Sequence, residues 1–207
     1  MTHTKSLIAV AMGLGMLALP VAAAEKGTWS VGVGVGMVQP KDDNGSLVNG
    51  TLDADVGDSV RPTFTLEYFV MDNVGIELLA ATPFQHSVKL DGLGEVATVQ
   101  HLPPTLSVNY HFSGLTPVTP FIGAGLNYTT FFEEKTKGAL DGSKIRLGDS
   151  FGLALHAGLD FDILDSSAIR FDVRWMDIDS EVKLNGDKVG TAEIDPWVFG
   201  ISYVFDF

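Results

Sequence analysis

Apolar and polar side chains alternate along most of the chain after residue 24. Eight segments follow this period of two, and no segment after residue 24 sustains the spacing of an amphipathic helix. The uncharged stretch at 114–132 is long enough for a membrane helix, but Pro117 and Pro120 favour a turn followed by a strand. We therefore expect eight β-strands, at residues 28–38, 61–70, 74–82, 99–112, 120–132, 150–161, 168–178 and 196–207.

The spacers between these strands alternate between long and short. The long spacers are 39–60, 83–98, 133–149 and 179–195, and the short ones are 71–73, 113–119 and 162–167. An even number of antiparallel strands, with long loops at one end and tight turns at the other, is typical of an outer-membrane barrel. The sequence therefore predicts an all-β fold, an eight-stranded antiparallel transmembrane β-barrel with long extracellular loops and short periplasmic turns.

The two faces of each predicted strand carry different kinds of side chain. In the strand at 120–132, for example, Ile122 and Leu126 alternate with Gly123 and Asn127. The narrow interior of an eight-stranded barrel accommodates small or paired charged side chains, whereas large apolar and aromatic side chains suit lipid. We therefore expect the large apolar face to point outward. An aromatic girdle is expected near the short turns, formed by Tyr68, Tyr110, Phe112, Phe161, Tyr203, Phe205 and Phe207.

The two ends of the chain have the features of an exported barrel. Lys5 precedes the apolar stretch 7–19, and an A-x-A pattern at 22–24 marks a cleavage site. A retained transmembrane anchor is disfavoured, because a span needs about 20 apolar residues. We expect residues 1–24 to be a cleaved signal peptide and residues 25–207 to form the barrel domain.

The last strand ends at full hydrophobicity, in the sequence DPWVFGISYVFDF. We expect it to pair with the first strand, because an open sheet edge in hydrocarbon leaves backbone groups unsatisfied. Tyr203, Phe205 and Phe207 resemble the C-terminal aromatic signal by which the outer-membrane barrel assembly machinery recognises unfolded barrels. That machinery is therefore an expected partner.

Composition excludes several kinds of site. The net charge of −13 disfavours nucleic acid as a partner, and the absence of cysteine rules out disulfides and thiolate metal ligands. The histidines lack the spacing of a metal site, so we expect neither a metal nor a cofactor. Acidic residues in the long loops offer Ca²⁺ or divalent-bridged lipopolysaccharide as an alternative, but their spacing does not match an EF-hand and favours a solvated surface.

Five ordered motifs carry a family resemblance that covers the mature chain. They are ATPFQHSV (81–88), HLPPTLSVNYHF (101–112), PFIGAGLNYTTFF (120–132), FDVRWMDI (171–178) and DPWVFGISYVFDF (195–207). Together they resemble the OmpW family of bacterial outer-membrane proteins. The resemblance implies a location in the outer membrane of a Gram-negative bacterium, in contact with its lipid and lipopolysaccharide.

The resemblance also implies an outer-membrane channel for small hydrophobic solutes, which enter from outside and leave through a gap in the barrel wall. We expect this lateral gate at Pro83, with Pro103 and Pro104 on the facing strand, because proline cannot donate to a β-ladder. The alternative is that these prolines only end strands at the rim.

Inward positions are predicted to form a charged layer below an apolar one. The charged set, interpreted as a plug of the periplasmic half, is Glu67, Glu77, His156, Asp160, Arg170, Asp172 and Arg174. The alternative for this set is a selectivity lining or a proton relay. The hydrophobic passage above it is assigned to Leu47, Leu52, Leu79, Phe84, Phe131, Met176 and Val198. The alternative for this second set is simple packing.

Two other classes of function compete with a channel. A structural or adhesive barrel would have a sealed interior and would bind surfaces or partners through its loops. An enzyme would need a nucleophile and a base within hydrogen-bond reach. If His86 and Ser87 lay on a strand, these neighbours would point to opposite faces, while an inward cluster of His156, Asp160 and Ser202 would lack access to lipid. We therefore expect no catalysis.

Overall fold

The computed structural model describes residues 25–48, 50–115 and 117–207, and the expected signal peptide at 1–24 lies outside the described residues. Across these ranges no helix is long and apolar enough to cross a membrane. One short 3₁₀ helix, η1, covers Gly138–Leu140. The strands are β1 (Trp29–Gln39), β2 (Ser46–Leu47), β3 (Leu52–Val56), β4 (Ser59–Met71), β5 (Val74–Ala81), β6 (Phe84–Leu90), β7 (Gly94–Leu102), β8 (Thr105–His111), β9 (Val118–Thr136), β10 (Ile145–Leu147), β11 (Ser150–Leu164), β12 (Ser167–Met176), β13 (Asp179–Leu184), β14 (Asp187–Glu193) and β15 (Trp197–Asp206).

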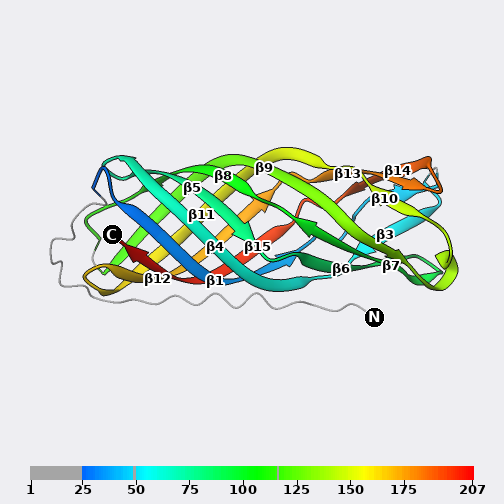
Figure 1. Cartoon of the computed structure of the whole chain (residues 1–207), viewed down its shortest axis with the longest axis horizontal. Helices are drawn as coiled ribbons and strands as arrows, with labels where there is room; N and C mark the ends of the chain where they lie inside the picture. Colours follow the sequence, from blue (N-terminus) through cyan, green and yellow to red (C-terminus); the bar gives the residue numbers. More distant parts are fainter. Residues whose placement is uncertain (1–24, 49, 116) are drawn as a thin grey trace, which may run out of the picture.

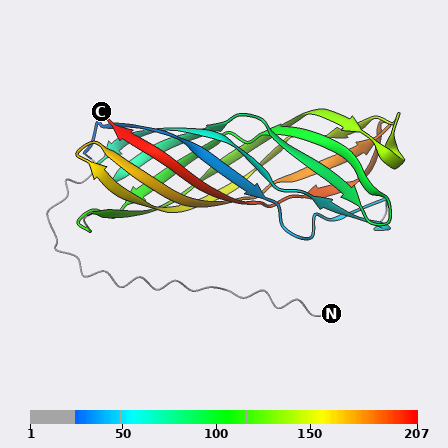
Figure 2. The same cartoon turned by 90° about the horizontal axis from the view of Figure 1, so that it is seen from below.

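Eight of these strands close into an antiparallel barrel, which confirms the predicted fold. Their order around the wall is β1, β4, β5, β8, β9, β11, β12 and β15, after which β15 pairs with β1. The closing pair runs in unbroken register from Ser30↔Asp206 to Gln39↔Trp197. Figures 1 and 2 show an elongated barrel with tilted strands, with the end of β15 beside the start of β1. Because β15 pairs with β1, none of the eight strands is left as a free edge of the sheet.

Outward side chains are large and apolar, as the alternation predicts. On β15, Trp197 and Phe199 are 49% and 47% exposed, whereas the intervening lumen-facing Val198 is buried. The aromatic side chains near the short turns contact one another, with ring centroids 4.7 Å apart for Trp29 and Tyr68. This apolar belt is the surface that meets lipid.

The long connections predicted at the end opposite the C-terminus are present, and much of their length is itself β-structure. The spacers 83–98 and 179–195 are largely β-hairpins, β6–β7 and β13–β14, and the later part of β9 runs beside them and pairs with β7 (Figure 1). Register shifts interrupt the β6–β7, β7–β9 and β13–β14 pairings, so the period of two is broken there. These extensions enclose an apolar cluster of Leu47, Ala54, Leu90, Val96, Ala97, Ile145, Val182 and Ala192.

Deleting Phe207 is expected to reduce the amount of folded barrel in the outer membrane. Its backbone exchanges two hydrogen bonds with Trp29, of 2.9 and 3.0 Å, and its ring is 66% exposed at the short-turn end. The deletion removes the last ladder pair and the terminal aromatic ring, so assembly should suffer more than solute selectivity. Heat-modifiable migration of outer-membrane fractions measures this yield. Leu164→Ala, which shortens an equally exposed side chain at the same end, should leave the yield unchanged.

Candidate functional site

The lumen contains a buried charged layer in the half of the barrel near the short turns. The structure brings together all seven residues that the sequence assigned to it, Glu67, Glu77, His156, Asp160, Arg170, Asp172 and Arg174. They project from β4, β5, β11 and β12. Buried charges persist only when they are paired and hydrogen-bonded, and this network supplies both kinds of contact.

Arg170 is the centre of this layer. Its Nε and Nη2 atoms donate to the two oxygens of Asp160 at 2.7 and 2.9 Å, and its Nη1 donates to Glu77 Oε2 at 2.9 Å. The guanidinium also lies 4.4 Å above the centroid of the Phe121 ring, within the range of a cation–π contact. One arginine therefore ties β12 to β11, β5 and β9.

Arg174 continues the network from the other side of Glu77. Its Nη2 donates to Glu77 Oε1 at 2.5 Å, and its Nε lies 3.4 Å from Asp172 Oδ2. His156 Nε2 lies 3.2 Å from the same Asp172 oxygen, and His156 Nδ1 lies 3.4 Å from Asn109 Oδ1. These contacts thus cross the lumen from β5 to β12 and return through β11 to β8, the neighbour of β5 in the wall.

Sequence reasoning left two residues out of the charged layer. Glu67 Oε1 accepts a hydrogen bond from Asn109 Nδ2 at 3.1 Å and lies 3.0 Å from His111 Nε2. Both residues are buried on β8. The alternation along the predicted strand at 99–112 could have identified them, because it places Asn109 and His111 on the face that points into the lumen.

Glycines make the space that these side chains occupy. A Cβ at Gly75 would collide with the Glu67 carboxylate, and one at Gly200 would collide with the Asp172 carboxylate. An eight-stranded lumen is barely wide enough for its side chains, so these positions tolerate no larger residue without displacing a charge.

A small cavity, here called the lower cavity, lies directly above the charged layer. Asp172 and Arg174 line it on one side, and its empty space is about 470 Å³ including openings. Four residues of the predicted passage also line it, Leu79, Phe84, Met176 and Val198. Pro103 of the predicted gate, in the turn between β7 and β8, lies in the same wall.

The β-ladder is broken beside this cavity. Pairing of β5 with β8 ends at Leu79↔Thr105, and pairing of β6 with β7 begins at Phe84↔His101. Four residues, 80–83, therefore oppose three, 102–104, and no ladder pair joins these two described segments. The three predicted gate residues, Pro83, Pro103 and Pro104, all lie in this break.

Side chains and the backbone of neighbouring strands satisfy backbone groups at the break, where the amide of Tyr128 donates to the carbonyl of Pro104 at 3.0 Å. Arg61 Nε donates to the carbonyl of Pro83 at 2.9 Å. On the facing strand, Asn127 Nδ2 lies 3.2 Å from the carbonyl of Pro103 and 3.3 Å from that of Pro104. The segments 80–83 and 102–104 are therefore bonded to their other neighbours, β4 and β9, while no ladder pair joins them to each other.

A second cavity, here called the upper cavity, lies farther from the charged layer, inside the strand extensions. It has about 570 Å³ of empty space including openings, and Leu47 and Phe131 of the predicted passage line it. Leu52 packs against the adjacent cluster rather than lining the cavity. Phe84, which is 2% exposed, packs in an apolar layer with Val198, Phe131 and their neighbours between the two cavities.

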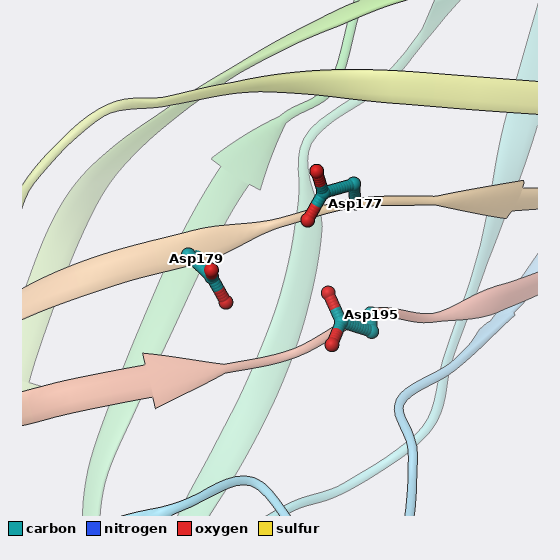
Figure 3. Close-up of side chains that lie close together, drawn as sticks. All are labelled: Asp177, Asp179 and Asp195. Atoms are coloured by element: carbon teal, nitrogen blue, oxygen red, sulfur yellow. The ribbon is translucent and has the colours of Figure 1, made fainter.

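Three carboxylates form an acidic group that sequence reasoning did not identify. Asp177, Asp179 and Asp195 have ligand atoms within 4.8 Å of one another, on chain segments that leave β12, begin β13 and precede β15 (Figure 3). Lys41 Nζ lies 2.9 Å from Asp195 Oδ2. This lysine already supplies a compensating cation.

The barrel fold agrees with comparisons to known proteins. The OmpW family model matches residues 25–207. This chain belongs to the OmpW family. Outer membrane protein W of Vibrio cholerae is 36% identical over 211 residues, covering 94% of this chain and 97% of that protein. The OmpW-family relatives are named as outer membrane proteins of Gram-negative bacteria, and this chain is an outer-membrane barrel like them.

Solved structures of the OmpW family share this barrel. The crystal structure of the outer membrane protein OprG from Pseudomonas aeruginosa matches with a TM-score of 0.82 and 32% identity, covering 90% of this chain and 99% of that one. A shorter match, 30% identical over 63% of this chain and 62% of the relative, is to the dibenzothiophene metabolism operon protein PahQ of Pseudomonas aeruginosa.

Proposed function

We propose that this OmpW-family barrel admits small hydrophobic molecules from the outside and releases them sideways into the membrane. The observation that carries the proposal is the order of layers in the lumen. Two cavities with largely apolar linings lie above a floor of buried charges, and the lower cavity adjoins the break in the β-ladder. A solute that enters the lumen is therefore opposed from below by the buried charged layer. Beside it lies the part of the wall where no ladder pair joins 80–83 to 102–104.

The charged layer opposes movement along the barrel axis. An apolar solute gains nothing from buried carboxylates and guanidinium groups, and to pass them it would have to break hydrogen bonds such as that of Arg170 with Glu77. Ions would likewise have to displace partners that are already paired. We therefore assign the layer a plug role, in preference to a proton relay.

The break at 80–83 and 102–104 supports lateral exit. Pro103 is buried against the lower cavity, whereas Thr82 and Pro104 are exposed on the outer surface, so the wall there is a single layer of side chains. The name of the relative PahQ, from a dibenzothiophene metabolism operon, also favours an apolar solute. The route from cavity to lipid is then short and apolar.

Uptake of naphthalene by Gram-negative cells tests the proposal. Cells that produce the chain should take up naphthalene faster than cells without it, while uptake of a sugar should not change. Ala81→Trp, which fills the lower cavity, should abolish the difference. Leu153→Trp adds the same ring to the lipid-facing surface, where the present side chain is 59% exposed, and should preserve it.

A sealed structural or adhesive barrel is the competing function. The burial of Phe84 between the two cavities favours it, because this ring closes the direct path from one to the other. Equal naphthalene uptake with and without the chain, at matched levels of folded protein, would establish the sealed barrel instead.

A further inference from the structure

Two buried histidines line the upper cavity and have ring nitrogens without partners. His86 on β6 and His101 on β7 are each 4% exposed. Their rings stack with centroids 4.9 Å apart and an angle of 15°. The Nε2 atoms of both are buried and have no hydrogen-bond partner among the described residues. Buried polar atoms are rarely left unpaired, so these two nitrogens are free to bond to a molecule in the cavity.

The rings are neutral, and one has a defined tautomer. Nδ1 of His86 lies 2.5 Å from the carbonyl oxygen of Gly57, which can only accept, so Nδ1 carries the proton and Nε2 offers a lone pair. Burial lowers the pKa of His86, against the opposing effects of the Gly57 carbonyl and Asp58. Burial, with the neighbouring His86, lowers the pKa of His101 to about 3. Both strands lie beyond the apolar belt, where outward side chains are polar.

The rest of the cavity is apolar. Valines, leucines, isoleucines and Phe131 line it, and the centroid of the His101 ring lies 5.5 Å from that of Phe84 and 5.8 Å from that of Phe131. A cavity with apolar walls and a few convergent polar atoms is the usual form of a small-molecule site. A pure hydrocarbon would fill it and leave both nitrogens unpaired.

We propose that the upper cavity selects apolar molecules that carry one hydroxyl group, such as phenols or medium-chain alcohols. The hydroxyl donates to Nε2 of His86 and accepts from the Nε2–H tautomer of His101, while the apolar body lies against the valines and the aromatic rings. This inference rests on the proposed function, because it names the class of solute that the passage would take.

Binding of 1-naphthol and naphthalene to the full chain in lipid nanodiscs tests the inference, with empty nanodiscs as the correction for partitioning. The wild-type barrel should bind 1-naphthol more tightly than naphthalene. His101→Phe keeps an aromatic ring in the stack and removes both ring nitrogens of His101. The ratio of the affinity for 1-naphthol to that for naphthalene should then fall by about fivefold, as expected for one hydrogen bond. Val99→Ala, on the same strand and cavity wall, should change both affinities alike.

A second measurement covers the case in which His101→Phe folds poorly. In the ¹⁵N-histidine spectrum of the wild-type barrel, 1-naphthol should shift the His86 Nε2 resonance and naphthalene should not. Equal affinity for the two ligands, with no such shift, overturns the hydroxyl selectivity and leaves the proposed function standing. Failure of both ligands to bind above empty nanodiscs overturns the inference together with the upper cavity's role in the passage.

Discussion

Replacing Arg170 with methionine is expected to lower the free energy of unfolding by about 3–5 kcal/mol, the range for removing one partner of a buried ion pair. Arg170 is 2% exposed and holds Asp160 through two hydrogen bonds and Glu77 through a third. Its loss leaves the buried Asp160 without its arginine and Glu77 with Arg174 alone, and methionine restores only part of the packing. Urea unfolding in detergent micelles, followed by tryptophan fluorescence, measures the change.

Two further variants show whether the loss comes from the charged layer. Lys135→Met removes a cation whose partner, Glu133, is exposed, and should cost less than about 1 kcal/mol. Adding Asp160→Asn to Arg170→Met removes one of the stranded charges and should recover part of the stability. Similar small losses for Arg170→Met and Lys135→Met would contradict a tightly coupled buried network.

Closing the break in the β-ladder is expected to slow naphthalene uptake between about tenfold and a hundredfold. Replacing Pro83, Pro103 and Pro104 with valine supplies backbone donors, and each restored ladder hydrogen bond adds about 1 kcal/mol to the cost of separating the strands. Initial uptake rates in cells measure the effect. Amide hydrogen exchange at 80–84 and 101–105 should show new protection in the same variant.

The matched control places the same substitution far from the break. Pro120→Val lies on β9 near the short turns, paired with Leu159, and should leave uptake unchanged. A bismaleimide tether between Thr82→Cys and Pro104→Cys closes the gap without relying on the ladder, since the natural chain has no cysteine to compete. Undiminished uptake through tethered, folded barrels would rule out lateral exit at this position.

Much of the charged layer was predictable because alternation fixes which face of a strand each side chain takes. Arg170, Asp172 and Arg174 occupy every second position of one strand, so all three point to the same face, toward the lumen. Which carboxylate each arginine contacts was not predictable. Glu77 is 93 residues from Arg170 along the chain and reaches it only because the closed barrel brings β5 opposite β12.

The upper half of the lumen was harder to predict because its strands do not keep a single period. The extra residue at 80–83 shifts the parity, so that Leu79 and Phe84 both point inward although five positions separate them. His86 fell in a segment taken for a loop, where no face could be assigned. The histidine pair therefore became visible only when β6 and β7 were seen to pair.

The sequence by itself determined the number of membrane strands, the lipid-facing side of each strand and the family, because these follow from local alternation and from ordered motifs. The tertiary structure alone decided where the ladder breaks, how the apolar lumen divides into two cavities and which buried groups lack partners. Those features depend on the register between strands and on bulges, which place residues distant in the chain side by side. No local pattern of apolar and polar positions contains that information.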